Sequence, residues 1–382
     1  MGLTEPKENK TSTAANLGPG FDTLGLALSL YLTLQVQVAQ AIPDVVNVNS
    51  HHDEIIDVSQ SPALCEPFNQ SVKLQYAESG FSADLPLEPS RNLITKTAWY
   101  VLRCHGLLAF PRHITVTVTN AIPLGRGLGS SAAAVVAGVL LANEVANLNL
   151  PKSRMLDLSL AIERHPDNVS AALLGGFVAS YLHEDQTTDH TRALEGQFTP
   201  VDRDNRQTDA FAPLAMAPRM PPAPLSHYVQ LPWAPEIKAV AIIPQFQLAT
   251  VKARAVLPKN YTRADVVFNL QRLAVLTHAL GQSPPDAQLI YPAMADRVHQ
   301  PHRAGLVPGL TTVLETLTPE TVPGLLGACL SGAGPTILVL ATHNFDTIIT
   351  QAREILAKHE VATDATVLEV ASKGAESQLL KS

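Results

Sequence analysis

The chain has 382 residues, of which 46% are hydrophobic and 16% charged, and its formal net charge is −7. This length favours two packed domains over a single core. An acidic chain without a dense tract of Lys and Arg lacks the charge pattern of proteins that bind the phosphate backbone, so we expect no nucleic-acid partner.

The three cysteines, Cys65, Cys104 and Cys329, are too widely spaced for a zinc motif or a disulfide framework, which predicts a reducing compartment. The first ten residues lack the apolar core of a secretory signal. The longest apolar run, Ala132 to Ala142, is too short to cross a bilayer. We therefore expect a cytoplasmic protein without a membrane partner.

In the first half of the chain, strand and helix patterns alternate irregularly. Residues 5–14 show no strand-like alternation, whereas 24–38 alternate after Ser29 and predict a half-buried strand. We then expect a helix over 92–107, a β-branched strand over 113–123, a wholly apolar buried helix over 131–145 and a short strand after Gly176.

Residues 183–235 are polar and then proline-rich, which predicts an insertion or connection between a domain at 1–182 and a second at 236–382. In the second domain we expect the following elements in order: a strand over 237–244, a helix over 265–280, a loop and strand over 329–341, and a helix then a strand over 345–370. Without a regular strand–helix–strand alternation, these elements favour an α+β fold.

A glycine-rich loop, PLGRGLGSSAA at Pro123–Ala133, joins the predicted strand to the buried helix. The alternate glycines Gly125, Gly127 and Gly129 let the backbone approach a ligand, and the N–H groups of the helix start face the same point. Such a site binds anions, and a polyphosphate suits it. The simpler alternative is a glycine turn capped by serine.

Two other segments concentrate polar groups. ANLGPGFD, at Ala15–Asp22, offers the amide of Asn16 and the carboxylate of Asp22 on a restricted turn, although an Asx-type turn before a strand would use the same residues. IERHPDNV, at Ile162–Val169, holds two carboxylates, an imidazole and an amide, and its plainer interpretation is helix capping by Asp167 or Asn168.

These motifs resemble those of the GHMP kinases, which phosphorylate small molecules with ATP. PLGRGLGSSAA is similar to their second motif, which wraps the ATP phosphates, and LSGAGPT at 330–336 is similar to the third. ANLGPGFD and ERHPDN are similar to the forms found in homoserine kinases, and NLITKTAWYVLR resembles fungal members.

The resemblance implies the two-domain GHMP kinase fold, with an N-terminal domain of the ribosomal-protein-S5-domain-2-like type and a ferredoxin-like C-terminal domain. It implies that Ser131 and Glu163 hold Mg²⁺, with Asp157 as the alternative to Glu163, and that Asn92 contacts adenine. Ser331 is expected to buttress the phosphate loop rather than touch ligand. The implied ATP-binding residues of the loop are Pro123, Gly125, Arg126, Gly127, Leu128, Gly129, Ser130, Ser131, Ala132 and Ala133.

By the same resemblance, the substrate is L-homoserine, the product is O-phospho-L-homoserine in threonine biosynthesis, and the protein is a homodimer. Arg297 is the alternative to Arg303, and Asp22 either takes the proton of the hydroxyl or only orients it. A mevalonate or sugar kinase and a non-catalytic ligand-binding paralogue are the competing functions. The implied homoserine-binding residues are Asn16, Asp22, His165, Asn168, Arg254 and Arg303.

Overall fold

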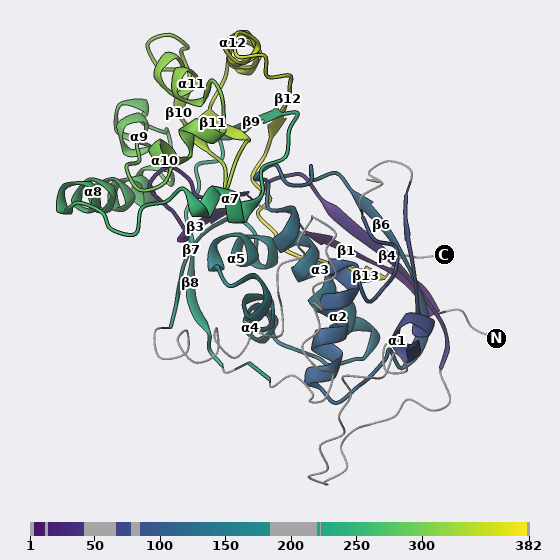
Figure 1. Ribbon diagram of the computed structural model, residues 1–382. Coiled ribbons are helices and arrows are strands. Elements are labelled where there is room, and N and C mark those ends of the chain that lie inside the picture. Colours follow the sequence, from purple (N-terminus) through teal and green to yellow (C-terminus); the bar gives the residue numbers. More distant parts are fainter. Residues whose placement is uncertain are drawn as a thin grey trace.

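The computed structural model describes residues 4–11, 14–41, 66–77, 85–183, 220–221 and 223–379. Within these ranges the chain forms three sheets, with helices packed between and around them. Figure 1 shows a lower unit that contains two of the sheets and an upper unit that contains the third. The expected α+β class is confirmed.

The five-stranded sheet of the lower unit has the order β13-β1-β4-β6-β5 and is antiparallel except between β5 and β6. It contains β1 (Thr4–Thr11), β4 (Leu32–Ala41), β5 (Val72–Tyr76), β6 (Arg112–Asn120) and β13 (Glu376–Leu379). Strand β6 alternates buried apolar residues with more exposed polar ones, as a sheet with one face on a core requires.

The second sheet of this unit has the order β2-β3-β7-β8. It contains β2 (Ala14–Ala15), β3 (Leu24–Leu26), β7 (Phe177–Leu182) and β8 (Ser226–Leu231). The helices of the unit are α1 (Glu66–Ser71), α2 (Leu93–Cys104), α3 (Ser130–Val145), α4 (Lys152–Glu163) and α5 (Pro166–Leu174). Figure 1 shows α2 to α5 between the two sheets.

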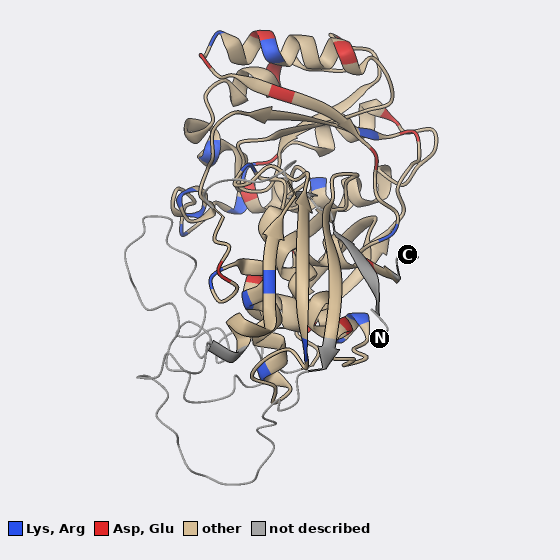
Figure 2. Cartoon of the chain, turned by 90° about the vertical axis from the view of Figure 1, so that its right-hand side faces the viewer, with Lys and Arg blue, Asp and Glu red and all other residues tan. Residues whose placement is uncertain are grey.

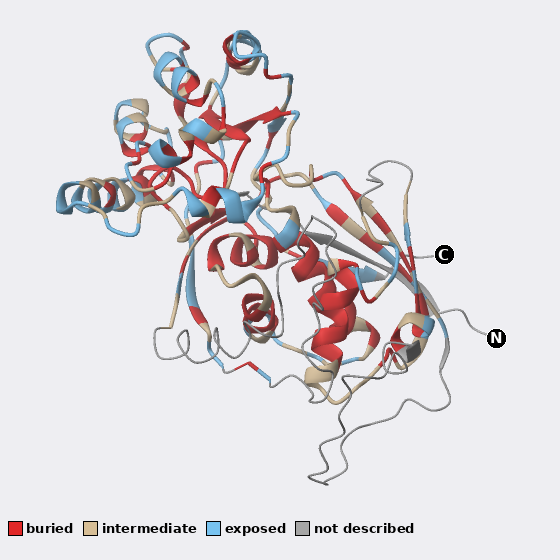
Figure 3. Cartoon of the chain, in the orientation of Figure 1, coloured by how far each residue is buried: buried red, intermediate tan, exposed pale blue. Residues whose placement is uncertain are grey.

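Helix α3 is the centre of the lower unit. Nearly all its side chains are buried (Figure 3), and it packs against α2, α4, α5 and the five-stranded sheet. Because alanine, valine and leucine of the helix itself occupy all its faces, no face of it can be exposed to water. The buried helix expected from the sequence is confirmed.

The upper unit is built on an antiparallel sheet of order β10-β11-β9-β12. It contains β9 (Lys238–Pro244), β10 (Leu325–Leu330), β11 (Ile337–Ala341) and β12 (Thr363–Leu368). Its helices are α7 (Thr250–Ala255), α8 (Arg263–Ala279), α9 (Ala287–Ala293), α10 (Gln300–Arg303), the 3₁₀ turn η2 (Ala304–Leu306), α11 (Leu310–Thr316) and α12 (Phe345–Ala357). One sheet face packs on α12, and the other joins the core of the lower unit.

The structure corrects several expectations. Residues 4–11 form strand β1 despite their polar sequence, because backbone pairing with β4 and β13 on both sides holds them in the sheet. The strand expected over 24–38 is divided into β3 and β4, which lie in different sheets.

The connection expected over 183–235 includes a strand, β8, which pairs along its whole length with β7 although most of its residues are exposed. Residues 184–219 of that connection, and Cys65, lie outside the described residues, while Cys104 and Cys329 are free thiols. Strand β13 hydrogen-bonds to β1, so the end of the expected C-terminal domain at 236–382 returns to the first sheet.

Figure 2 shows Lys and Arg interspersed with Asp and Glu, without a uniformly basic face in that view of the described residues. None of the helices in the described ranges is long and apolar enough to cross a membrane.

Candidate active site

The phosphate loop connects β6 to α3 and is the turn that the sequence predicted. Gly125, Gly127 and Gly129 all have left-handed backbone angles, with φ of 65°, 79° and 66°. Gly129 is the N-cap of α3 and has no side chain to cap the helix, so the N–H groups of the first turn stay available to an anion. Ser130 to Ala133 form that first turn, and Ser131 is its exposed residue.

The third motif packs directly on the phosphate loop. The Ser331 hydroxyl, which is fully buried, donates to the Gly127 carbonyl at 2.7 Å, and the Thr336 N–H donates to the Arg126 carbonyl at 3.2 Å. A Cβ on Gly127 would lie 2.3 Å from the Ser331 carbonyl oxygen, so only glycine permits this approach. Ser331 therefore supports the loop, as the sequence predicted.

The two expected metal ligands lie side by side. The Ser131 hydroxyl donates to Glu163 Oε2 at 3.1 Å, across the start of α3 and the end of α4. Asp157 is buried instead, where its carboxylate accepts from the Leu225 N–H at 2.8 Å and pairs with Arg154 at 3.1 Å. The geometry therefore favours Glu163 over Asp157 as the partner of Ser131.

The first motif, ANLGPGFD at Ala15–Asp22, is a tight loop that presents Asp22. Asn16 and Asp22 both have left-handed φ, of 59° and 52°, and Asn16 Oδ1 accepts from the Asp22 N–H at 2.9 Å, which closes the loop. A Cβ on Gly25 would lie 2.0 Å from the Asp167 carbonyl, so glycine in β3 lets the loop lie against α5. Asn16 thus shapes the turn, and the first motif meets the segment IERHPDNV at Ile162–Val169.

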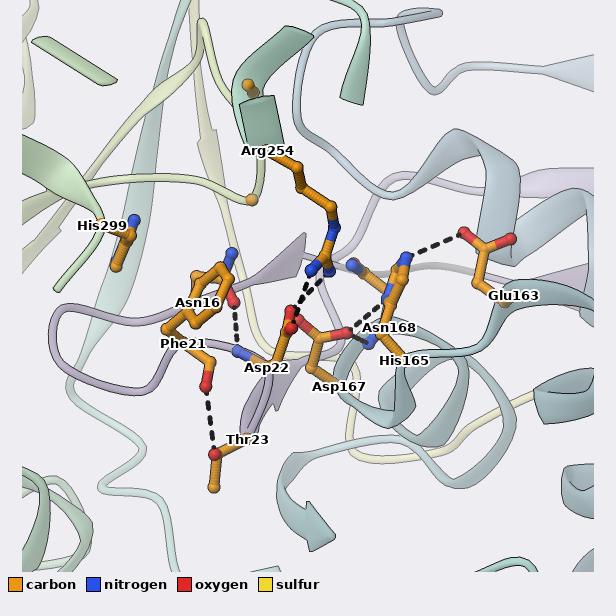
Figure 4. A network of polar contacts seen from close by, with 12 residues as sticks. Asn16, Phe21, Asp22, Thr23, Glu163, His165, Asp167, Asn168, Arg254 and His299 are labelled. Carbon is orange, nitrogen blue, oxygen red and sulfur yellow. Dashed lines mark hydrogen bonds and ion pairs between the residues drawn. The ribbon is translucent and has the colours of Figure 1, made fainter. Parts of the chain in front are cut away.

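Arg254 joins Asp22 from the upper unit. Its two terminal nitrogens donate to the two Asp22 oxygens at 2.9 and 2.7 Å, a bidentate ion pair between residues 232 positions apart (Figure 4). The Arg254 guanidinium carbon also lies 5.5 Å from the centre of the Phe21 ring. Burial lowers the pKa of Arg254, but Asp22, Asp167 and Glu163 together outweigh burial and raise it above its ordinary value.

His165 and Asp167 form a second ion pair beside the first. His165 Nδ1 lies 2.8 Å from Asp167 Oδ1, and its Nε2 lies 3.7 Å from Glu163 Oε1. Burial lowers the pKa of His165, but the carboxylates of Asp167 and Glu163 reverse this and raise it to about 9. Burial raises the pKa of Asp167, and contact with His165 and the Asn168 N–H brings it below its ordinary value.

Figure 4 shows Arg254, Asp22, Asp167, His165 and Glu163 converging from both units on one region, with Asn168 among them. Arg303 lies behind it, buried, with its guanidinium donating to the carbonyls of Ala253 at 3.1 Å and Gly332 at 2.8 Å. Burial lowers the pKa of Arg303 to about 10, so it stays cationic at neutral pH.

Two predicted residues have other partners. Arg297, the alternative to Arg303, pairs with Asp265 at 3.6 Å on α8. Asn92 is the buried N-cap of α2: its oxygen accepts from the Ile94 N–H at 3.0 Å, and its amide nitrogen donates to the Tyr76 hydroxyl and the Pro86 carbonyl. These bonds use both amide protons and make Asn92 a helix cap, while its contact with adenine stays a prediction.

Sequence reasoning missed His299, which is completely buried between the two units. Its ring stacks on Phe21 at 5.4 Å, and its Nε2 lies 2.9 Å from the Gly18 carbonyl. The available signal was its position four residues before Arg303, which places the two on one face of a helix.

Similarity to known proteins identifies the family of the chain. The family model of the GHMP kinases N terminal domain matches residues 92–176. A homoserine kinase of Saccharomyces cerevisiae is 49% identical over 365 residues, which cover 95% of this chain and 96% of that protein. The homoserine kinase of Schizosaccharomyces pombe is 45% identical over 364 residues, or 95% of this chain and 96% of that protein. This chain belongs to the homoserine kinase family. The resemblance to fungal homoserine kinases is thereby confirmed.

Solved structures agree on the fold of this homoserine kinase family member. The crystal structure of homoserine kinase from Cytophaga hutchinsonii has a TM-score of 0.69 and 23% identity, and the match covers 99% of both chains. L. major mevalonate kinase in complex with R-mevalonate has a TM-score of 0.55 and 13% identity, over 97% of this chain and 96% of that one. These likenesses show the fold alone, and they confirm the expected GHMP kinase fold.

We predict that Gly127→Ala destabilises the protein and weakens ATP use. The added Cβ would meet the Ser331 carbonyl in a left-handed conformation, which costs about 1–3 kcal/mol. Denaturant unfolding and the KM for ATP measure the effect. Gly305→Ala is the matched control, because a Cβ there meets nothing within 4 Å. Equal stability of the two variants would contradict the close approach at Gly127.

We predict that His165 stabilises the fold below alkaline pH. Since its pKa is raised from 6.5 to about 9, the imidazolium form is the one that the fold favours. Its contribution is complete below about pH 6.5 and is lost as the pH rises through about 9. The difference in Tm between the wild type and His165→Gln should therefore shrink between pH 7 and pH 10. A difference that is constant over this range would count against the charged histidine.

Proposed function

We propose that this protein transfers the γ-phosphate of ATP to the side-chain hydroxyl of L-homoserine, which gives O-phospho-L-homoserine in threonine biosynthesis. The observation that carries the proposal is the arrangement of the Asp22–Arg254 pair close to His165, Glu163 and the exposed start of α3. Groups suited to an amino acid thus lie near groups suited to a polyphosphate.

At the amino-acid end, the guanidinium of Arg254 matches the α-carboxylate of the substrate in shape and charge. The same guanidinium is paired with Asp22. When the substrate carboxylate takes this partner, Asp22 becomes free to accept from the substrate hydroxyl. Arg303 adds a buried positive charge near this end of the site. Asp167 and the side-chain amides of Asn16 and Asn168 offer acceptors for the ammonium group of the substrate.

At the phosphate end, the loop Pro123–Gly129 and the first turn of α3 bind the triphosphate through backbone N–H groups. Little covalent help is needed, because positioning and charge neutralisation dominate phosphoryl transfer. The imidazolium of His165, between Glu163 and Asp167, adds a fixed positive charge near the site of transfer.

The residues present fit Mg²⁺. Ser131 and Glu163 supply two hard oxygen ligands 3.1 Å apart, and the described residues contain no cluster of three acidic, His or Cys side chains that would hold a metal alone. Mg²⁺ commonly takes one or two protein ligands and completes its shell with phosphate oxygens and water. Bound there, it would supply charge neutralisation to ATP.

The acidic groups distinguish this proposal from its competitors. Mevalonate and sugars have no ammonium group, whereas this site holds the carboxylates of Asp22 and Asp167 near the guanidinium of Arg254. ATP consumption by the purified protein with homoserine, mevalonate, galactose and serine tests the proposal. We expect turnover with homoserine. Turnover with mevalonate or galactose instead would favour another GHMP kinase, and binding without turnover would favour a non-catalytic paralogue.

We predict that Asp22→Asn lowers kcat by ~10²–10⁴-fold, as removal of a general base does. The variant keeps the size of the side chain and loses its charge. Asp346→Asn, on the exposed start of α12, is the control for the substitution itself. A decrease of less than tenfold in kcat would assign Asp22 to orienting the hydroxyl rather than to taking its proton.

We predict that Ser131→Ala increases the Mg²⁺ concentration needed for half-maximal activity by about tenfold, since the variant removes one of two protein oxygens. Ser131→Thr keeps the hydroxyl and should stay near the wild type. If titration of the alanine variant with Mg²⁺ matches that of the wild type, Ser131 is not a metal ligand.

A cytoplasmic location and a homodimer belong to the same proposal, as does a division into two domains in which strands β8 and β13 pair with strands of the first. The free thiols of Cys104 and Cys329 support the first of these, since a reducing compartment keeps thiols free.

A further inference from the structure

The short helix α10 buries a histidine and an arginine between the two units. His299, its N-cap, and Arg303, its last residue, have exposed fractions of 0% and 1%. Within the part of the chain that the structure describes, neither forms a bidentate ion pair with a carboxylate. Instead, each makes directed hydrogen bonds to the loops that carry the active-site groups.

The partners of His299 select one form of its ring. The Gly18 carbonyl, 2.9 Å from Nε2, can only accept, so Nε2 carries a proton. Arg303 Nη1, 3.3 Å from Nδ1, can only donate, so Nδ1 is the acceptor. One neutral tautomer satisfies both bonds. Burial lowers the pKa of His299, which agrees with this neutral form even though Asp296 Oδ2 lies 3.7 Å from Nε2.

Arg303 extends the contact to two further segments of the chain. Its Nε donates to the carbonyl of Ala253, the residue before Arg254, and its Nη1 donates to the carbonyl of Gly332 in the third motif. The His299–Arg303 pair therefore touches three separate segments: the first motif through Gly18, helix α7 through Ala253, and the third motif through Gly332.

Phe21, in the loop that presents Asp22, packs against the His299–Arg303 pair. The His299 ring stacks on it with an interplanar angle of 24°, and the guanidinium carbons of Arg254 and Arg303 lie 5.5 and 5.1 Å from its centre. Asp22 is the next residue in the chain. A shift of the imidazole would therefore displace Phe21, which contacts Arg254 and is adjacent to Asp22 in the chain.

We propose that His299 is a positioning residue for the amino-acid end of the active site. It holds Arg303, Phe21 and the Gly18 turn in the arrangement in which Arg254 and Asp22 receive the substrate. The proposal rests on the proposed function, because the effect is exerted on homoserine binding. His299 acts through these neighbours and does not itself touch the reacting atoms.

The test is His299→Phe, which keeps an aromatic ring on Phe21 and removes both hydrogen bonds. We expect the KM for L-homoserine to rise by about tenfold or more, with the KM for ATP within about threefold of the wild type, because the altered bonds support the amino-acid loops. Circular dichroism and the melting curve establish that the variant is folded. His302→Phe is the matched control: this histidine lies on the same helix next to Arg303 but is exposed, and its KM values should match the wild type.

Two conservative variants separate the bonds. His299→Asn keeps an acceptor for Arg303, and His299→Gln keeps a donor for Gly18, so each should give a KM for homoserine between those of the wild type and His299→Phe. If the phenylalanine variant does not fold, these two carry the test.

Several results would overturn the inference. One is a folded variant whose KM for homoserine stays within twofold of the wild type. A second is a loss of activity in proportion to the folded fraction, with both KM values unchanged. A third is unfolding of all three variants. The second and third results would both mean that His299 has a structural role only. A wild-type protein that does not phosphorylate homoserine would instead refute the proposed function, so the two failures are distinguishable.

Discussion

The active site depends on a backbone contact between the two units at the phosphate loop. The loop carbonyls of Gly125, Arg126 and Gly127 accept from Leu248 N–H, Thr336 N–H and the Ser331 hydroxyl, all of which belong to the upper unit. Leu248 leads directly into α7, which carries Arg254. The contact that shapes the glycine-rich loop therefore also fixes the start of α7 beside it, and at Gly127 the close approach requires glycine.

The charged side chains of the site balance one another. Arg254 is paired with Asp22, and the imidazolium of His165 is paired with Asp167 and lies close to Glu163. Isolated charges in such a partly buried region would be costly, so these groups are paired with one another. A zwitterionic amino acid carries both signs of charge and can exchange partners with the pairs. This explains how so many ionised groups are tolerated together.

The scaffold behind the site is rigid for a simple reason. Helix α3 begins at the phosphate loop and continues into the core, where its alanine and valine side chains are packed on all sides. Closely packed interiors transmit small displacements rather than absorb them. The position of Ser131 at its exposed end is therefore fixed by the whole lower unit, and on the opposite side His299 and Arg303 fix the loop of Asp22 in a comparable way.

The sequence by itself determined the local elements and chemistry: the glycine loop, the buried helix after it, the strand β6, and the motifs that hold Asp22, Glu163 and His165. These are carried by residue type and by spacing within one segment, which sequence patterns record directly. Only the tertiary structure decided the pairing of Asp22 with Arg254, the contact of Ser131 with Glu163, the capping role of Asn92 and the place of His299. The tertiary structure also decided that the polar residues 4–11 form strand β1. Each of these depends on backbone and side-chain partners far away in the chain, and the identity of such a partner is set by packing rather than by the neighbouring residues.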